Sequence, residues 1–267
     1  MKALFFFALQ WLGINRLFRW HYRGRVKTLL FHRVLERVEN YPNAIAAAEF
    51  DLQIRELKRH HNVIGLNRTG DISGYRRDKV NVLITFDDGF EDNYRVAYPI
   101  LLKHGATACF FVIANCIARG EPPSFAKRYM VSEGSDDGFR TVTANQIAEM
   151  AAAGMTIGSH SLDHSNYQKA TFEQGVIDAQ QAKAVLEEQL KMEIGDFAFP
   201  WGFCHPGQAE AIKRFYRRIY TTEHGFNDPG DWLIRRSEVA NTYHMYAAAS
   251  GALDWFGHLL LSRKVKV

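Results

Sequence analysis

The chain has 267 residues, of which 47% are hydrophobic and 23% charged, a globular composition that excludes disordered, collagen-like and coiled-coil proteins. Its 33 basic and 29 acidic side chains leave a formal net charge of only +4, so we expect no nucleic-acid partner. The three cysteines are not spaced as a disulfide framework or a zinc ribbon requires, which favours a reducing compartment.

Residues 1–24 form an aromatic and basic segment, with arginines interleaved among the aromatic side chains between Phe5 and Arg23. No cleavage site of a secretory signal peptide follows it, and the sequence has no apolar run of about 18 residues that could span a membrane. Two interpretations stay open, a helix lying on a membrane surface and a helix packed on the domain. We expect a cytoplasmic protein, peripheral at the inner membrane face if this segment binds lipid.

Residues 25–267 contain no internal repeat and no linker rich in Pro, Gly or Ser, so they are predicted to form one domain. Short apolar runs predict strands at Val26–Phe31, Val80–Phe86, Ala106–Ile113, Met155–Gly158 and Phe197–Phe199, and near Ile219 and Leu233. Helices are predicted at Glu49–His61, Asp92–His104, Thr143–Ala153 and Thr171–Met192, and near Gln208–Tyr216. This alternation predicts parallel strands joined by helices.

Two local signals refine this order. The helices that start at Thr143 and Thr171 each open with a capping box, in which a threonine is followed three residues later by a glutamine. Residues Ile117–Arg140 contain paired prolines and several glycines, and are predicted to form a long loop over one rim of the sheet.

Polar side chains follow two of the predicted strands at the point where each strand ends. Asp87 and Asp88 close one strand, and His160 and His164 follow another. Histidines at this spacing lie on the same side of a helical turn, where both imidazoles can reach one metal ion, and a carboxylate from the neighbouring strand end completes a three-ligand site. Adjacent carboxylates on an extended strand point opposite ways, so one can bind metal while the other accepts a proton from water.

Each motif has an ordinary structural explanation when taken alone. An Asp-Asp-Gly sequence is usually a turn or a helix cap, and two histidines at this spacing usually lie on a surface without function. Their joint placement after separate apolar strands of an alternating chain favours a metal site.

Four segments taken in order resemble the polysaccharide deacetylase family, carbohydrate esterase family four. They are LFHRV at 30–34, TFDDG at 85–89, SHSLDH at 159–164 and FAFPWG at 197–202. The early Phe-His pair is similar to the branch that includes deacetylases of poly-N-acetylglucosamine biofilms. The resemblance covers residues 26–239 and implies a distorted (β/α) barrel of seven or eight mostly parallel strands.

The resemblance also implies roles for individual residues. The metal ligands would be Asp88, His160 and His164, holding zinc or another divalent ion such as Co²⁺, Ni²⁺, Mn²⁺ or Fe²⁺. Asp87 would be the general base and His32 the general acid, while Pro200 and Trp201 would contact substrate. Many members carry an arginine two residues before the motif proline, where this chain has Ala198; we expect Arg236 to supply that guanidinium from another strand and orient Asp87.

These implications predict a metal-dependent hydrolase that removes an N-acetyl group from an amino sugar in a polysaccharide, an oligosaccharide or a glycan precursor. A first alternative is an iron oxygenase, because two histidines and one carboxylate also form the facial triad of non-haem iron enzymes. The second aspartate argues against it. A second alternative is a carbohydrate-binding homologue without catalytic activity.

Overall fold

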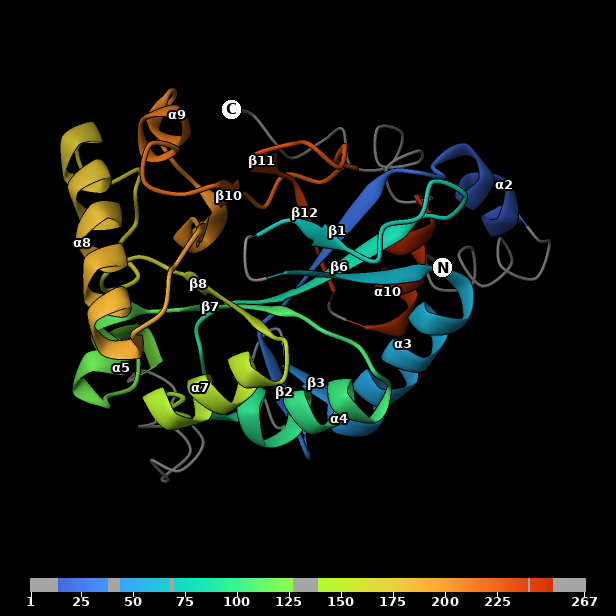
Figure 1. Cartoon of the computed structure of the whole chain (residues 1–267), viewed down its shortest axis with the longest axis horizontal. Helices are drawn as coiled ribbons and strands as arrows, with labels where there is room; N and C mark the ends of the chain where they lie inside the picture. The colour runs from blue at the N-terminus through green and yellow to red at the C-terminus, as the bar shows by residue number, and fades with distance from the viewer. Residues whose placement is uncertain (1–13, 38–43, 68–69, 127–138, 240, 252–267) are drawn as a thin grey trace.

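The computed structural model describes residues 14–37, 44–67, 70–126, 139–239 and 241–251, and shows a mixed α/β fold in which helices surround a strongly twisted sheet (Figure 1). The strands of the described chain are β1 (Val26–Phe31), β2 (Arg33–Leu35), β3 (Ala44–Ala46), β4 (Asn62–Leu66), β5 (Ile72–Ser73), β6 (Asn81–Phe86), β7 (Cys109–Val112), β8 (Thr156–Ser159), β9 (Asp196–Ala198), β10 (Arg218–Tyr220), β11 (Leu233–Ile234) and β12 (Arg236–Glu238).

The helices lie around the outside of the sheet (Figure 1). The α-helices of the described chain are α2 (Ile14–His21), α3 (Ala47–His60), α4 (Tyr98–Lys103), α5 (Ala114–Arg119), α7 (Ala144–Ala152), α8 (Phe172–Leu190), α9 (Gln208–Ile212) and α10 (Thr242–Ser250). Shorter turns complete the set: the π-helix η1 (Asn93–Ala97) and the 3₁₀ helices η2 (Ser124–Ala126) and η4 (Pro200–Gly202).

The main sheet is almost entirely parallel, as the alternation of strands and helices predicts. Its hydrogen-bonded order is β11-β10-β9-β8-β7-β6-β1-β12, with β4 paired to β6 and the short β5 antiparallel to β4. Strands β2 and β3 form a separate parallel pair. Because β1, β6, β7 and β8 run in the same direction, their carboxyl ends meet at one rim, where the motif residues follow them.

The barrel prediction is confirmed only in its coarser part, a mixed α/β fold. The strand order is an open path from β11 to β12. These two end strands are consecutive in the chain and are separated by Arg235 alone. Nevertheless β11 pairs with β10 at one end of the strand order, and β12 pairs with β1 at the other end.

Two apolar layers cover the sheet, because successive side chains on a strand face opposite sides. The larger cluster lies between sheet and helices and includes Leu29, Ile84 and Phe110. The smaller cluster lies on the opposite face of the sheet and includes Leu83, Phe111 and residues from seven strands in all. The strands are buried on both faces, which explains why they read as continuous apolar runs rather than alternating ones.

Helix α2 packs on the domain with one side and faces solvent with the other. Phe18 is buried, and the Ser250 hydroxyl of α10 lies 3.4 Å from the Asn15 side-chain oxygen. Leu17 and Trp20 are exposed. The packed interpretation therefore holds for the described part of the segment, whereas its first 13 residues lie outside the described chain and membrane contact stays a prediction. In the part of the chain that the structure describes, no helix has the length and apolarity needed to cross a membrane.

Several elements depart from the sequence prediction. The segment predicted as one long loop contains the end of α5 and η2, while residues 127–138 lie outside the description. The helix predicted from Asp92 begins as the π-helix η1. Strands β2 to β5 and β12, and helix α10, were not predicted, because most have only two to five residues and depend on tertiary pairing.

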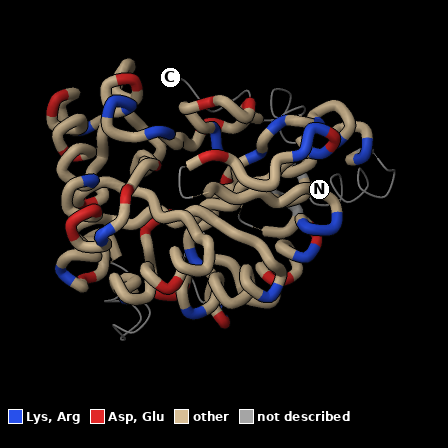
Figure 2. Tube along the Cα trace, viewed as in Figure 1, with Lys and Arg blue, Asp and Glu red and all other residues tan. Residues whose placement is uncertain are grey.

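The charged side chains are distributed without segregation by sign. Lys, Arg, Asp and Glu are interspersed over the traced chain (Figure 2).

Candidate metal centre and active site

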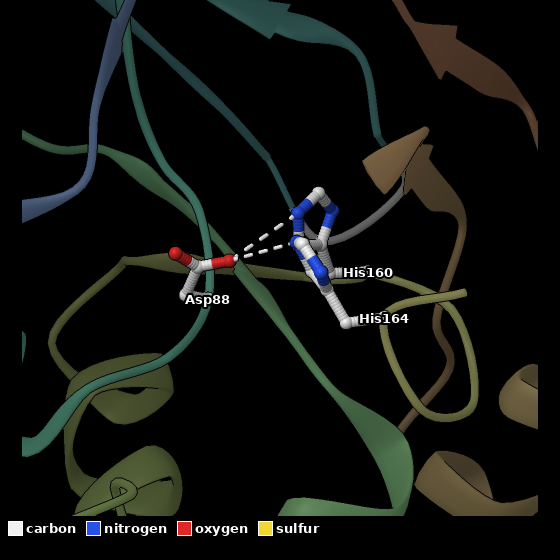
Figure 3. Close-up of side chains that lie close together, drawn as sticks. All are labelled: Asp88, His160 and His164. Atoms are coloured by element: carbon white, nitrogen blue, oxygen red, sulfur yellow. Dashed lines mark ion pairs between the residues drawn. The ribbon is translucent and has the colours of Figure 1, made fainter. Parts of the chain in front are cut away.

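Asp88, His160 and His164 converge at the carboxyl ends of β6 and β8, as the motif spacing predicts (Figure 3). The Asp88 Oδ1 atom lies 3.3 Å from Nε2 of His164 and 3.5 Å from Nε2 of His160. One ligand atom from each residue lies within 4.8 Å of the other two. All three side chains are nearly inaccessible to solvent. This is the separation at which three donors can share one metal ion.

The two histidines do not lie on a helical turn, so that part of the prediction is wrong. His160 directly follows β8, and His164 lies in an irregular loop in which Ser161 has a φ of 69° and His164 a φ of 59°. Asp88 also has a positive φ, of 76°. Such backbone conformations are uncommon for residues with a side chain, and persist where the surrounding structure imposes them. The loop, rather than helical periodicity, brings both imidazoles to Asp88.

Contacts with two helices hold this histidine loop. The Asp178 carboxylate of α8 accepts the Leu162 backbone N–H at 3.1 Å and the Tyr167 hydroxyl. At the start of α5, the backbone N–H groups of residues 114 and 115 donate to the carbonyls of residues 161 and 162. The loop backbone is therefore fixed at Ser161 and Leu162, between the two histidines. These tertiary contacts maintain the left-handed residues of the loop.

The arrangement fits a bound cation, because three electron-pair donors face one another. The Nδ1 atom of His160 lies 2.9 Å from the Ala198 carbonyl oxygen, which can only accept, so Nδ1 carries the proton and Nε2 presents a lone pair to Asp88. Burial lowers the pKa of His160 to about 4, which keeps the ring neutral at pH 7. Asp88 Oδ1 is buried and has no hydrogen-bond partner among the residues that the structure describes. Two imidazole nitrogens and one carboxylate are suitable ligands for zinc or a related divalent ion.

Asp87 lies beside this cluster and pairs with Arg236, as expected from the sequence. Nη1 and Nη2 of Arg236 donate to the two carboxylate oxygens at 2.6 and 2.8 Å, and Nε donates to the Thr221 carbonyl at 2.9 Å. Arg236 is completely buried and lies against the rings of Phe111 and Tyr220. Burial raises the pKa of Asp87, but the facing Arg236 guanidinium, together with smaller effects of the nearby histidines, leaves the net pKa lower than usual. Asp87 is therefore ionised, 3.8 Å from Nε2 of His160.

His32 lies beside these carboxylates at the end of β1. The β1–β6 register pairs Phe31 with Phe86, and the Asp87 N–H donates to the Phe31 carbonyl at 3.0 Å, which places the next residue, His32, at the same rim. Its ring is partly accessible to solvent, and Nδ1 lies 3.8 Å from the Glu238 carboxylate of β12. A partly exposed imidazole at this position can reach a molecule bound at the rim.

Comparisons with known proteins agree with this geometry. The family model "Polysaccharide deacetylase" matches residues 74–215, more than half of the chain. The chain belongs to the polysaccharide deacetylase family. This is the family of amide-hydrolysing carbohydrate esterases that the four sequence motifs resemble, so that prediction is confirmed.

Individual relatives of this deacetylase family support the assignment. The chain is 30% identical over 162 residues to the "Putative polysaccharide deacetylase YxkH" of Bacillus subtilis, and the match covers 60% of this chain and 51% of that protein. The chain thus spans about half the length of this curated relative. The structure of IcaB from Ammonifex degensii is 26% identical with a TM-score of 0.68, covering 85% of this chain and 97% of that one.

A second solved deacetylase shares the fold. Streptococcus pyogenes deacetylase PplD, in complex with acetate, matches with a TM-score of 0.67 and 21% identity, over 84% of this chain and 98% of that chain. The similarity to IcaB supports the branch that the early Phe-His pair indicated.

The deacetylase motif around Pro200 contributes an aromatic residue to the rim. Trp201 is 47% exposed, has a φ of 62°, and its ring centre lies 5.1 Å from that of His164. Pro200, by contrast, is buried and starts η4, so it supports Trp201 rather than offering a surface of its own. The described chain has five non-glycine residues with positive φ. Four of them lie at this site, namely Asp88, Ser161, His164 and Trp201, and the fifth is Lys191.

Sequence reasoning missed three residues that contact this candidate site. Phe125 lies with its ring centre 4.5 Å from that of His164, but it falls within the segment predicted as a loop. Glu238 faces His32, and Asp178 holds the histidine loop. Neither carboxylate belongs to a motif. Glu238 follows Arg236 at strand spacing, which is a signal that could have placed both on one face.

Proposed function

We propose that this protein is a metal-dependent deacetylase that removes the N-acetyl group from an amino sugar of a polysaccharide, an oligosaccharide or a glycan precursor. One observation carries the proposal: a buried carboxylate oxygen with no hydrogen-bond partner in the described part of the chain faces two imidazole Nε2 atoms, and a second carboxylate held by arginine lies beside them. This combination provides both a metal site and a separate proton acceptor.

Asp88, His160 and His164 would hold the divalent ion. When bound, such an ion lowers the pKa of a water molecule and polarises a carbonyl group. Three protein ligands leave coordination positions open, as in catalytic rather than structural zinc sites. Zinc suits this ligand set, and Co²⁺, Ni²⁺, Mn²⁺ and Fe²⁺ share its preferences.

Asp87 is assigned as the general base. It accepts a proton from the water that attacks the acetyl carbonyl carbon. Arg236 keeps this carboxylate ionised and fixes both oxygens, so that the base is oriented before substrate arrives. Its burial also prevents bulk water from competing for the carboxylate.

His32 is assigned as the general acid. The bond between the acetyl carbon and the sugar nitrogen breaks, and the imidazolium donates a proton to the departing nitrogen, which leaves as a free amine. The water oxygen remains on the acetyl carbon, so the second product is acetate. The Glu238 carboxylate lies 3.8 Å from His32 Nδ1, on the side of the ring next to β12.

The family and the aromatic rim support the proposed substrate class. Trp201 and Phe125 flank His164, and an exposed aromatic face can stack on the apolar face of a sugar ring. The acetate named in the structure of PplD is the product that this reaction would release, and supports an acyl-transferring use of the shared fold.

The two alternatives make different predictions in one experiment. Purified, metal-loaded protein is incubated with N-acetylated glucosamine oligomers, O-acetylated xylan oligomers and N-formylated sugars, and acetate or formate release is measured together with oxygen uptake. The proposal predicts acetate release from the N-acetylated substrates, which is lost in Asp87→Asn. Saccharide binding without acetate release would favour the non-catalytic homologue, and oxygen consumption would favour the iron oxygenase.

A further inference from the structure

His32 occupies a position where the chain changes sheets. It is the single residue between β1 of the main sheet and β2 of the small parallel pair. Among the described residues, none forms a hydrogen bond that orients its ring: Nδ1 is buried without such a partner, and the Glu238 carboxylate is 3.8 Å away. The position of the main chain that carries the imidazole therefore determines where the ring can reach.

That main chain is bound by two consecutive residues of another segment. The Asn93 side-chain amide donates to the His32 carbonyl at 2.8 Å. The neighbouring Asp92 carboxylate accepts the backbone N–H of Val34 at 3.0 Å and the Nε–H of Arg33 at 2.8 Å. Residues 32, 33 and 34 are thus all held by residues 92 and 93. Neither residue has a role in the chemistry proposed above.

The ion pair within this set is deeply buried. Arg33 is 3% exposed, and its guanidinium lies between the rings of Phe90 and Phe139, at 4.7 and 4.8 Å from their centres. A buried guanidinium needs its carboxylate partner, because an unpaired charge is costly in such surroundings. The pair therefore has one favourable geometry, which fixes where residue 33 can lie.

The same segment also carries the carboxylates of the proposed reaction. Asp87 and Asp88 precede Asp92 by a few residues. Three backbone hydrogen bonds hold the segment: the N–H of residue 87 donates to the carbonyl of residue 31, that of residue 91 to residue 140, and that of residue 142 to residue 89. Base, metal carboxylate and acid are in this way connected through one short, hydrogen-bonded unit.

We propose that Asp92 and Asn93 are positioning residues, which hold the backbone of His32 so that its imidazole reaches the departing nitrogen. This inference rests on the proposed role of His32 as general acid. Small displacements of a catalytic group lower the rate strongly, since a shift of about 1 Å can cost on the order of 100-fold. Loss of the Asn93 hydrogen bond should therefore impair proton donation specifically, and leave attack by water less affected.

Two substrates separate these steps. An N-acetylated glucosamine oligomer has a leaving group that needs a proton, whereas 4-nitrophenyl acetate has one that does not. The readout is the ratio of kcat/KM for the amide to kcat/KM for the ester. His32→Ala should lower this ratio, and Asn93→Ala should lower it roughly 10-fold. In the double variant, Asn93→Ala should add no further decrease, because the group that it positions is gone.

Asn227 offers a matched control, because it contacts the start of β1 whereas His32 follows the end of this strand. It is also a buried asparagine, its side chain donates to the Arg235 carbonyl at 3.0 Å, and its backbone pairs with Val26 at the start of β1. Asn227→Ala should lower the melting temperature and leave the ratio unchanged.

Each outcome decides between the two proposals. If His32→Ala lowers the ratio and Asn93→Ala does not, the positioning role is wrong while the proposed function stands. If His32→Ala leaves the ratio unchanged, the general-acid role fails and the positioning role fails with it. If Asn93→Ala does not fold, Asn93→Ser, which is too short to reach the His32 carbonyl, replaces it; a folded Asn93→Ser with an unchanged ratio also contradicts the inference.

Discussion

Different interactions determine the conformation of two neighbouring parts of the fold, the helices α7 and α8 and the loops that follow β6 and β8. Both helices begin with the capping boxes that their sequences predict: the Thr143 and Thr171 side chains accept the N–H groups of Gln146 and Gln174, whose side chains return the contact. The loops instead contain left-handed residues with side chains and buried polar atoms without partners. Local sequence thus specifies the helices, whereas tertiary contacts impose the conformations of the loops.

The largest effect is expected from the loop cluster itself. Alanine at Asp88, His160 or His164 should lower metal affinity by more than roughly 100-fold. Loss of a residue that only hydrogen-bonds to a metal ligand already lowers affinity by up to about 100-fold, and loss of the ligand itself should cost more. Acetate release should fall to background in the same variants. Metal content after dialysis, measured by mass spectrometry, checks this.

His205 provides the control for these substitutions. It is a partly buried histidine in a nearby loop, and its Nε2 contacts the Ala170 carbonyl. His205→Ala should retain one metal ion per chain; metal loss there equal to that in His164→Ala would remove the distinction between the cluster and its surroundings.

Asp87→Asn should separate catalysis from metal binding. Metal should stay bound, while turnover falls by about 10²–10⁴-fold, the range typical of a lost general base. Because the Arg236 charge is left buried without its partner, the free energy of unfolding should also fall by about 3–5 kcal/mol.

A compensating variant distinguishes these two effects. Asp87→Asn combined with Arg236→Met removes both charges, so denaturant unfolding should recover much of the lost stability while turnover stays low. Turnover that recovers together with stability would show that Asp87 only supports the fold.

Arg236→Ala tests the electrostatic part of the site. Arg236 holds the pKa of Asp87 below its usual value against the opposing effect of burial. Without the guanidinium, burial dominates and the pKa rises, so the acidic limb of the kcat/KM profile should move to higher pH. The pair stabilises the wild type above the ordinary carboxyl pKa, and this stabilisation is lost as the pH falls through the lowered pKa. A limb that stays in place in a destabilised variant would limit Arg236 to a structural role.

The smallest effect is expected from the helical side of the comparison. Thr171→Ala removes one N-cap of α8 and should lower the free energy of unfolding by about 1 kcal/mol. Because the cap is a local interaction, metal content and kcat/KM should match the wild type. A loss of metal in this variant would mean that α8 transmits its position to the histidine loop.

Sequence predicted the parts of the fold that depend on neighbouring residues. The buried strand Val26–Phe31 and the two capped helices lie where their patterns place them. The paired strands β2 and β3 could not be predicted, since three residues carry too little periodicity to indicate a strand.

The site shows the same division. The convergence of Asp88, His160 and His164 and the pairing of Asp87 with Arg236 were expected. The helical turn assumed for the histidines was wrong, because Ser161 and His164 adopt left-handed conformations that only the folded loop imposes. Asp92 and Asn93 were not singled out, since their contacts with residues 32–34 bridge about 60 positions of sequence.

The most direct test of metal-dependent deacetylation is a titration of metal-free protein with Zn²⁺, with acetate release from an N-acetylated glucosamine oligomer measured at each step. The site geometry predicts that the rate rises linearly with bound zinc, reaches a plateau at one ion per chain, and returns to background when a chelator is added. Acetate release by the metal-free protein at the full rate, or no release from the protein with one bound ion, would contradict the account.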